Sequence, residues 1–90
     1  MDRVLTSLVR QRILLALQEG ELHINELGLR TNSTYTRVSR NLAVLRERGL
    51  VEEQYFGQVR MTRLNWKNEK LQAALKALSL LRDAAVGDTR

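Results

Sequence analysis

The sequence predicts a small α+β fold that is mainly helical and carries one β-hairpin. Three observations support this prediction: apolar residues recur at helical spacing near both ends of the chain, two strand-like segments flank a Gly-Gln pair, and 43% of the residues are hydrophobic. That hydrophobic fraction is ordinary for a globular protein and too high for a disordered one. A chain of 90 residues is long enough for a single domain with one small core.

Residues 3–19 are predicted to form the first helix. Their apolar side chains cover an arc of roughly 220° on a helical wheel, whereas a surface helix needs only about 100°. This helix is therefore expected to be covered on two sides. The apolar positions are Val4, Leu5, Leu8, Val9, Ile13, Leu15, Ala16 and Leu17.

The next thirty residues are predicted to contain a short strand and two helices. Residues 22–24 alternate in polarity and predict the strand, and Asn25 is a favoured N-cap for a brief helix over 26–30. Residues 31–34, Thr-Asn-Ser-Thr, are typical of a turn. A third helix is expected over 35–48, and it should end before Gly49, which suits the position after a helix C-cap.

A β-hairpin is predicted over residues 50–64. Residues 50–56 and 59–64 have strand character, and Gly57-Gln58 suits a two-residue type II′ turn because glycine occupies its first position. The register that favours both apolar and opposite-charge pairs sets Val51 opposite Leu64, Glu52 opposite Arg63 and Tyr55 opposite Arg60.

A last helix is predicted over residues 66–85, with Trp66 as a packing anchor at its start. The element order is then helix, strand, helix, helix, hairpin, helix. Two short helices joined by a tight turn and followed by a hairpin make a helix-turn-helix with a wing. The whole chain is predicted to be one such domain, with residues 1–65 as its core, 66–86 as a C-terminal dimerisation helix and 87–90 as a frayed tail.

The positive charge is concentrated in the middle of the chain. Residues 30–63 carry seven arginines against three acids, whereas residues 1–29 have a net charge of −1. A local basic surface is typical of a protein that binds a polyanion. In the predicted third helix, Thr36, Arg37 and Arg40 lie opposite the apolar face. The N-terminal half of such a helix enters the major groove of DNA in helix-turn-helix docking.

Three blocks of the sequence resemble the winged helix-turn-helix of ArsR/MarR-like transcription regulators of bacteria and archaea. They are Arg12-Ile13-Leu14, Val38-Ser39-Arg40-Asn41-Leu42 and residues 45–51, and the resemblance covers roughly residues 10–65. It implies a dimer that binds near-palindromic operators in double-stranded DNA. The turn before the third helix, rich in Thr, Asn and Ser, and the short wing depart from the pattern. The thiol ligands of metal-sensing members are absent.

These observations predict a DNA-binding surface made of the recognition helix, residues 35–48, and the wing, residues 55–60. Arg40 is expected to read a base edge, since arginine bonds guanine bidentately, and Arg60 is expected to hold a phosphate. The wing is expected to lie on the adjacent backbone or in the minor groove. The predicted DNA-binding residues are Ser33, Thr34, Tyr35, Thr36, Arg37, Ser39, Arg40, Asn41, Gln58 and Arg60.

A homodimer is predicted from the width of the apolar faces on the first and last helices. In the last helix the apolar positions follow a/d spacing, and four further apolar residues, Ala73, Ala77, Leu80 and Ala84, widen that face. The predicted dimer interface consists of Leu5, Val9, Leu71, Ala74, Leu75, Leu78, Leu81 and Ala85.

No metal, cofactor or catalytic site is predicted. The chain has no cysteine and one histidine, His23, which is expected to be structural or exposed. Glu52 and Glu53 point to opposite faces of a strand and cannot form a carboxylate dyad. Arg10 and Arg12 interrupt the apolar run near the N-terminus, so we expect neither a signal peptide nor a membrane partner, and a cytoplasmic location.

Three functions remain compatible with these features. The first is a sequence-specific transcription regulator. The second is an architectural or nucleoid protein with little sequence preference, and the third is a winged-helix module that binds another protein. The arginines of the recognition helix disfavour the third. The ratio of affinities for the best sequence and for random duplex distinguishes the first two.

Overall fold

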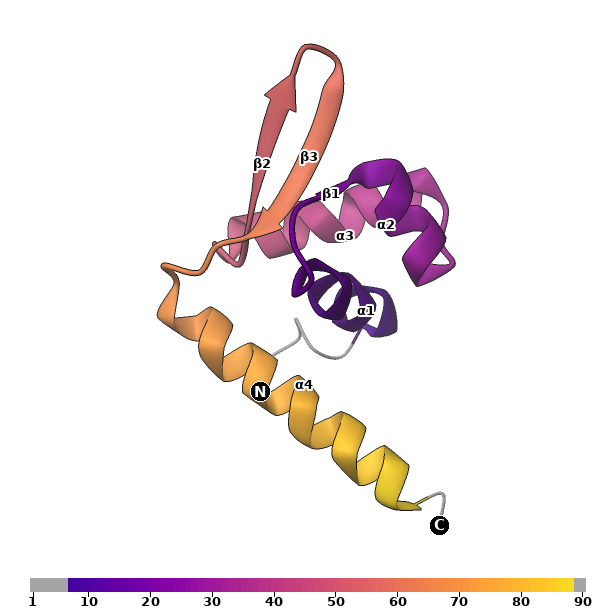
Figure 1. The fold of residues 1–90 in the computed structure, drawn as a ribbon, viewed down its shortest axis with the longest axis vertical. Coiled ribbons are helices and arrows are strands. Elements are labelled where there is room, and N and C mark those ends of the chain that lie inside the picture. Colours follow the sequence, from indigo (N-terminus) through magenta and orange to yellow (C-terminus); the bar gives the residue numbers. More distant parts are fainter. Residues whose placement is uncertain (1–6, 89–90) are drawn as a thin grey trace.

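The computed structural model describes the backbone of residues 7–88 and the side chains of residues 7–80. The elements follow the order α1-β1-α2-α3-β2-β3-α4, as the sequence predicts. Helices α1, α2 and α3 form a cluster, the hairpin β2-β3 projects from one side of it, and α4 leaves from the opposite side (Figure 1). The hairpin and α4 therefore point away from each other.

Helix α1 spans Leu8–Leu17 and is shorter than predicted. Ser7 is its N-cap, with the side chain accepting a hydrogen bond from the Arg10 amide. At the other end, residues 18–20 bond back only three residues, which closes the helix as a turn at Gly20. The predicted first turn at residues 3–6 lies outside the described residues.

The second helix begins earlier than predicted. Strand β1 spans only Leu22–His23, and α2 spans Ile24–Thr31. The predicted N-cap at Asn25 is wrong: His23 caps the helix, because its Nδ1 accepts a hydrogen bond of 3.0 Å from the Asn25 amide. The one histidine thus has a structural role, and Asn25 lies within the first turn.

Helix α3 spans Tyr35–Glu47, within a residue of the prediction. Asn32 ends α2 in the left-handed conformation, with φ of 53°, and Thr34 caps α3 by accepting from the Arg37 amide. After α3, Gly49 has a φ of 73°, and the Gly49 and Leu50 amides bond back to carbonyls of the last helical turn. These bonds form the glycine-dependent helix ending that the sequence predicts.

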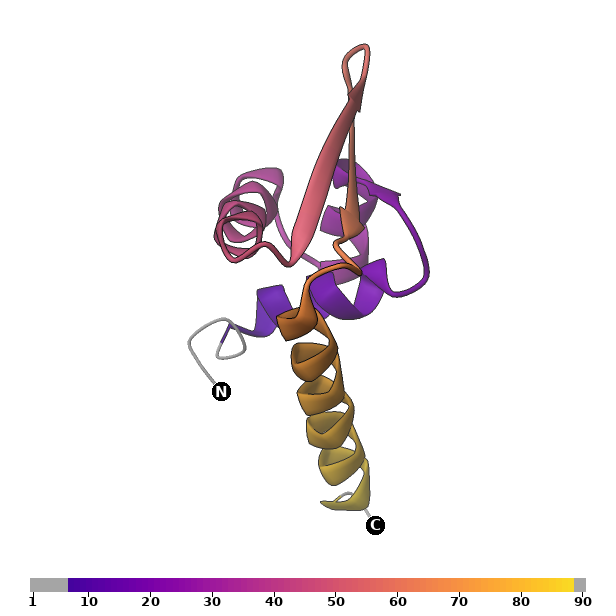
Figure 2. The same cartoon turned by 90° about the vertical axis from the view of Figure 1, so that its left-hand side faces the viewer.

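Strands β2 (Val51–Phe56) and β3 (Val59–Leu64) form the hairpin in the predicted register. β1 adds to the far edge of β3, so the sheet order is β1-β3-β2. Gly57 has a φ of 65° and Gln58 has a negative φ, a combination that fits type II′ rather than type I′. The hairpin is long and narrow and extends past the helices in both views (Figures 1 and 2).

Helix α4 spans Glu69–Asp88, so it begins three residues later than predicted and continues past residue 86. Asn65 and Asn68 explain the delay, since their side-chain oxygens accept from the Lys67 and Lys70 amides and hold residues 65–68 in turns. Trp66 lies in this segment and is exposed, so its predicted role as a packing anchor is wrong.

The core lies where α1, α2, α3, the base of the hairpin and the first half of α4 meet. Its fully buried members are aliphatic, and they include Ile13, Leu14, Leu27, Leu42, Leu45 and Leu71. The second half of α4 continues beyond this body (Figures 1 and 2). Among the described residues, no helix is both long enough and apolar enough to cross a membrane.

Candidate nucleic-acid interface

Helix α3 presents one buried and one exposed face, divided as the sequence predicts. Val38, Leu42 and Leu45 are fully buried against the core. The opposite face of the N-terminal half carries Thr36, Arg37 and Arg40, all of which are exposed. Within the part of the chain that the structure describes, the guanidinium groups of Arg37 and Arg40 have no ion-pair or hydrogen-bond partner.

The turn before α3 brings further polar groups to the same end. Ser33 donates to the Thr31 carbonyl, and the Thr34 hydroxyl caps the helix. Tyr35, the first helical residue, is exposed. The first amides of α3 lie at the positive end of a thirteen-residue helix, where an anion is favoured.

Asn41 and Ser39 are less available than Arg37 and Arg40. The Asn41 side chain donates to the Arg37 carbonyl at 2.8 Å, and its oxygen accepts from the Ser7 hydroxyl at 3.5 Å. Asn41 therefore links α3 to the N-cap of α1. Ser39 is half-buried and accepts a hydrogen bond from Arg60.

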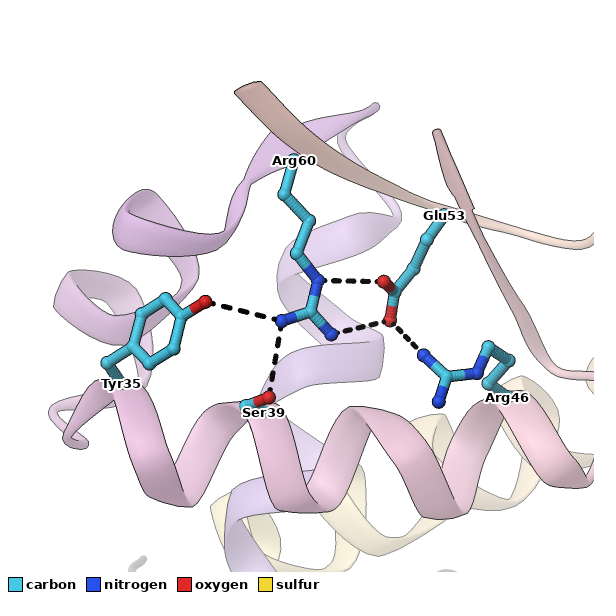
Figure 3. Close-up of polar contacts among 5 residues, drawn as sticks. All are labelled: Tyr35, Ser39, Arg46, Glu53 and Arg60. Atoms are coloured by element: carbon cyan, nitrogen blue, oxygen red, sulfur yellow. Dashed lines mark hydrogen bonds and ion pairs between the residues drawn. The ribbon is translucent and has the colours of Figure 1, made fainter. Parts of the chain in front are cut away.

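Arg60 joins the wing to the recognition helix (Figure 3). Its Nε and Nη2 atoms donate to the two carboxylate oxygens of Glu53, at 2.7 and 2.9 Å. Its Nη1 atom donates to Ser39 at 3.2 Å and to the Tyr35 hydroxyl at 3.5 Å. Arg46, near the end of α3, donates to Glu53 at 2.7 Å. We call these five residues the wing lock: Tyr35, Ser39, Arg46, Glu53 and Arg60.

Burial strengthens the contact at the centre of the wing lock. The side chain of Glu53 is 6% exposed and that of Arg60 is 14% exposed, so both charges lie where water screens them poorly. The hydrogen bonds from Arg60 lower the pKa of Glu53 below its ordinary value, against the opposing effect of burial. The bonds from Glu53 likewise raise the pKa of Arg60. The pair therefore remains charged at neutral pH.

Sequence reasoning missed Glu53 and Arg46 as parts of this site. A signal for Glu53 was present, because the predicted pairing of Tyr55 with Arg60 places Glu53 diagonally across from Arg60 on the same face of the hairpin. Diagonal neighbours of this kind are within reach of long side chains. No comparable sequence signal existed for Arg46, since its contact depends on how the wing packs against α3.

The wing tip carries no charged side chain. Gln58 is exposed at the turn, as predicted, and so are its neighbours Tyr55, Phe56 and Val59. Below the tip, Arg63 pairs with Glu52 at 2.9 Å. Both wing arginines are thus bound to wing glutamates. To make the phosphate contact that the sequence predicts, Arg60 would have to break at least one of the hydrogen bonds that its guanidinium group donates in this structure.

The residues predicted to form the dimer interface lie mainly inside the single chain. Val9, Leu71, Ala74, Leu75 and Leu78 are buried against the chain's own core. Leu5 is outside the described residues, as are the side chains of Leu81 and Ala85. Among the described side chains of α4, the exposed apolar ones lie on its other face, at Ala73 and Leu80, with Ala77 half-buried between them.

Among the described residues, no group of three or more His, Asp or Glu side chains is arranged to hold a metal ion. Two surface depressions in the described part of the chain are shallow. One is lined by α2 and the turn that follows it, including Gly28, Leu29 and Ser33, and the other by Arg12, Glu19 and Arg30 with apolar residues of α1. Arg30 binds both Glu19 and Glu26, so its charge is neutralised locally.

Several solved structures similar to this one are described as transcription regulators. The structure is similar to HlyU from Vibrio cholerae in its reduced form, with a TM-score of 0.75 and 28% identity over 88% of this chain and 81% of that chain. It is equally similar to the transcriptional repressor BigR from Xylella fastidiosa, with a TM-score of 0.75 and 29% identity over 88% and 79% of the two chains.

A third similar structure is a solution structure from Mycobacterium bovis. It is the homodimeric winged helix-turn-helix DNA-binding domain of a possible ArsR-family transcriptional regulator, with a TM-score of 0.75 and 25% identity over 93% of this chain and 75% of that chain. No curated protein sequence matches the chain.

The sequence itself matches the MarR family over residues 6–54, which is more than half of the chain. This segment contains α1, β1, α2, α3 and the start of the wing, and so it includes both helices of the helix-turn-helix. Sequence and fold agree, and the chain belongs to the MarR family of winged-helix transcription regulators.

Proposed function

We propose that the protein is a homodimeric regulator that binds a specific sequence in double-stranded DNA through α3 and the wing. The observation that carries this proposal is a pair of exposed arginines, Arg37 and Arg40, on the N-terminal half of α3, whose guanidinium groups have no partner among the described residues. An unpaired arginine on this face can form two parallel bonds to a guanine edge. Such a protein acts in the cytoplasm, where its DNA is.

The predicted site residues divide into four roles. Thr36, Arg37 and Arg40 face the groove and read bases. Ser33, Thr34 and the first amides of α3 hold the phosphate at the edge of the groove. The position of α3 relative to its neighbours is fixed by hydrogen bonds of Tyr35, Ser39, Asn41 and Arg60. Through its bonds Arg60 also positions the wing. Gln58 meets DNA from the wing tip.

Two measurements on the wild-type protein test the proposed function. A dimer that makes about 6–10 phosphate contacts loses roughly 10³–10⁵ in affinity between 50 and 200 mM salt. We also expect the best duplex selected from a random library to bind at least about 10³ more tightly than random duplex. A ratio near one would indicate an architectural protein, and binding insensitive to salt would indicate a protein-binding module.

The dimer is proposed to form on the outer face of α4, which revises the interface predicted from sequence. Ala73, Ala77 and Leu80 recur at spacings of four and three residues, so they share one side of the helix. Leu8, the first residue of α1, is another exposed aliphatic side chain. A two-fold axis there would place the recognition helices about 34–36 Å apart, one turn of DNA.

The test of this interface compares two neighbouring residues of α4. Leu80→Glu places a charge in the proposed contact, whereas Ser79→Glu places it on an exposed position about 100° away around the helix. Sedimentation should show that Leu80→Glu is monomeric and that Ser79→Glu remains dimeric. A wild-type monomer at micromolar concentration, or a dimeric Leu80→Glu variant, would rule out this face.

A further inference from the structure

The tip of the wing is apolar on both faces of the hairpin. Tyr55, Phe56 and Val59, which we call the apolar tip, are 65%, 59% and 42% exposed. Phe56 pairs directly with Val59 across the turn, and Tyr55 lies on the opposite face beside Arg60. Isolated exposed hydrophobic residues are common in proteins, but three adjacent ones at the end of a projecting element indicate a binding surface.

The chain's own elements and its proposed dimer leave this tip uncovered. In both views the hairpin extends past the helices, with no other described element beside its end (Figures 1 and 2). The outer face of α4 lies at the opposite end of the molecule (Figure 1). A second copy bound there would not reach the wing tip.

The apolar tip is continuous with the proposed DNA surface. Tyr55 is directly opposite Arg60, and the Arg60 guanidinium contacts Tyr35 and Ser39 at the start of α3. The wing lock therefore fixes the direction of the hairpin relative to the recognition helix. When α3 enters a major groove, a hairpin held beside it meets the backbone or the adjacent minor groove.

The chemistry of the tip favours the minor groove over the phosphates. Residues 54–59 contain no cation, and Arg60 and Arg63 are both paired with glutamates, so the tip gains little from phosphate charge. Proteins that bind the minor groove often insert apolar side chains between base pairs and bend the duplex by about 20–90°. Gly57 adds no side chain to the tip, and the space where its Cβ would lie is open.

We propose, on the basis of the proposed function, that the apolar tip is a wedge for the minor groove of DNA. Phe56 and Val59 partly unstack one base step at each end of the operator, and the duplex bends there. The Gln58 amide donates to acceptors on the floor of the groove. Because TA and CA/TG steps unstack most easily, operators should carry such a step where each wing tip enters.

The experiment measures DNA bending by energy transfer between dyes at the two ends of a duplex. The duplex carries the sequence that the wild-type protein selects from a random library. We compare wild type with Phe56→Ala and with Phe56→Lys, which replaces the wedge by a cation. Trp66→Ala is the matched control, because Trp66 is an aromatic residue of similar exposure, 55%, at the base of the wing. Thermal melting of each free variant checks that it is folded.

We expect wild type and Trp66→Ala to bend the duplex by at least about 20°. Phe56→Ala should bind about tenfold more weakly, equivalent to about 1.4 kcal/mol, and should lose most of the bend. Phe56→Lys should lose the bend while its affinity depends more steeply on salt. Val59→Ser provides a second test, with a smaller loss of the bend.

Two results would overturn the inference, and they are distinguishable. If both Phe56 variants bind and bend DNA like wild type, the tip does not enter the groove, although the proposed function stands. If the wild-type protein binds no duplex even at low salt, the proposed function fails and the inference fails with it.

Discussion

The arginines in the N-terminal half of the recognition helix and those of the wing have opposite surroundings. Arg37 and Arg40 of α3 are exposed, and no described side chain binds them. Arg60 and Arg63 of the wing are each bound to a glutamate of the neighbouring strand. The sequence places all four in the same basic segment. Only the first two are free to bind another molecule without first losing a partner.

The net charge of a segment is therefore a poor guide to how much of its positive charge can bind another molecule. Glu52 and Glu53 neutralise both wing arginines, and Glu53 also binds Arg46 of α3. Much of the positive charge in residues 30–63 therefore stabilises the fold instead of attracting DNA. The N-terminal half of the recognition helix keeps its positive charge, since it contains no acidic residue.

The largest effect is expected from Glu53→Gln, which leaves the half-buried Arg60 without its partner. Breaking a buried ion pair on one side costs about 3 kcal/mol, so the free energy of unfolding should fall by about that amount in urea denaturation. The matched control is Glu52→Gln in the exposed pair with Arg63, which should cost less than about 1 kcal/mol. Equal losses of unfolding free energy in the two variants would show that the wing lock stabilises the fold no more than the exposed pair does.

The next effect concerns Arg40 and DNA. Arg40→Ala should weaken binding to the selected duplex by about 1–3 kcal/mol and to random duplex by much less. The protein should keep its stability, because the Arg40 side chain has no described partner to lose. Equal weakening on both duplexes in a titration would contradict base reading by Arg40.

The pH dependence of stability follows from the lowered pKa of Glu53. Because the pKa is lower in the folded state, the carboxylate stabilises the fold fully above the ordinary glutamate value of 4.5. That contribution is lost as the pH falls through the lowered value. The gap in unfolding free energy between wild type and Glu53→Gln should thus be constant from neutral pH to about 4.5 and shrink in more acid solution. A gap that widens in acid would refute this assignment.

The smallest effect distinguishes a buried hydroxyl that has a partner from one that has none. Thr62 is fully buried on β3, and its hydroxyl has no hydrogen-bond partner within the described part of the chain. Thr62→Val should therefore raise the free energy of unfolding by up to about 1 kcal/mol. Thr31→Val is the control: its buried hydroxyl donates to the Leu27 carbonyl at 2.7 Å, so its removal should cost about 1 kcal/mol. Changes of the same sign would contradict this distinction.

Local patterns in the sequence predicted the elements, the hairpin register and the polar face of α3. Each depends on residues close together in the chain, such as the Gly57-Gln58 turn and Gly49 after α3. The N-cap of α2 was misassigned for a local reason as well: the imidazole of His23 took a role for which asparagine is usually favoured. The two asparagines before α4 displaced its start in the same way.

The sequence by itself determined the winged-helix order and which arginines face away from the core, because helix and strand periodicity fix the face on which a side chain lies. Only the tertiary structure decided which charges are free and which face of α4 is exposed. Whether Arg60 meets Glu53 and Ser39 depends on how the hairpin packs against α3. Whether Leu78 or Leu80 is exposed depends on how α4 docks on the core. The sequence of α4 offers two apolar faces, and only its packing shows which of them is buried.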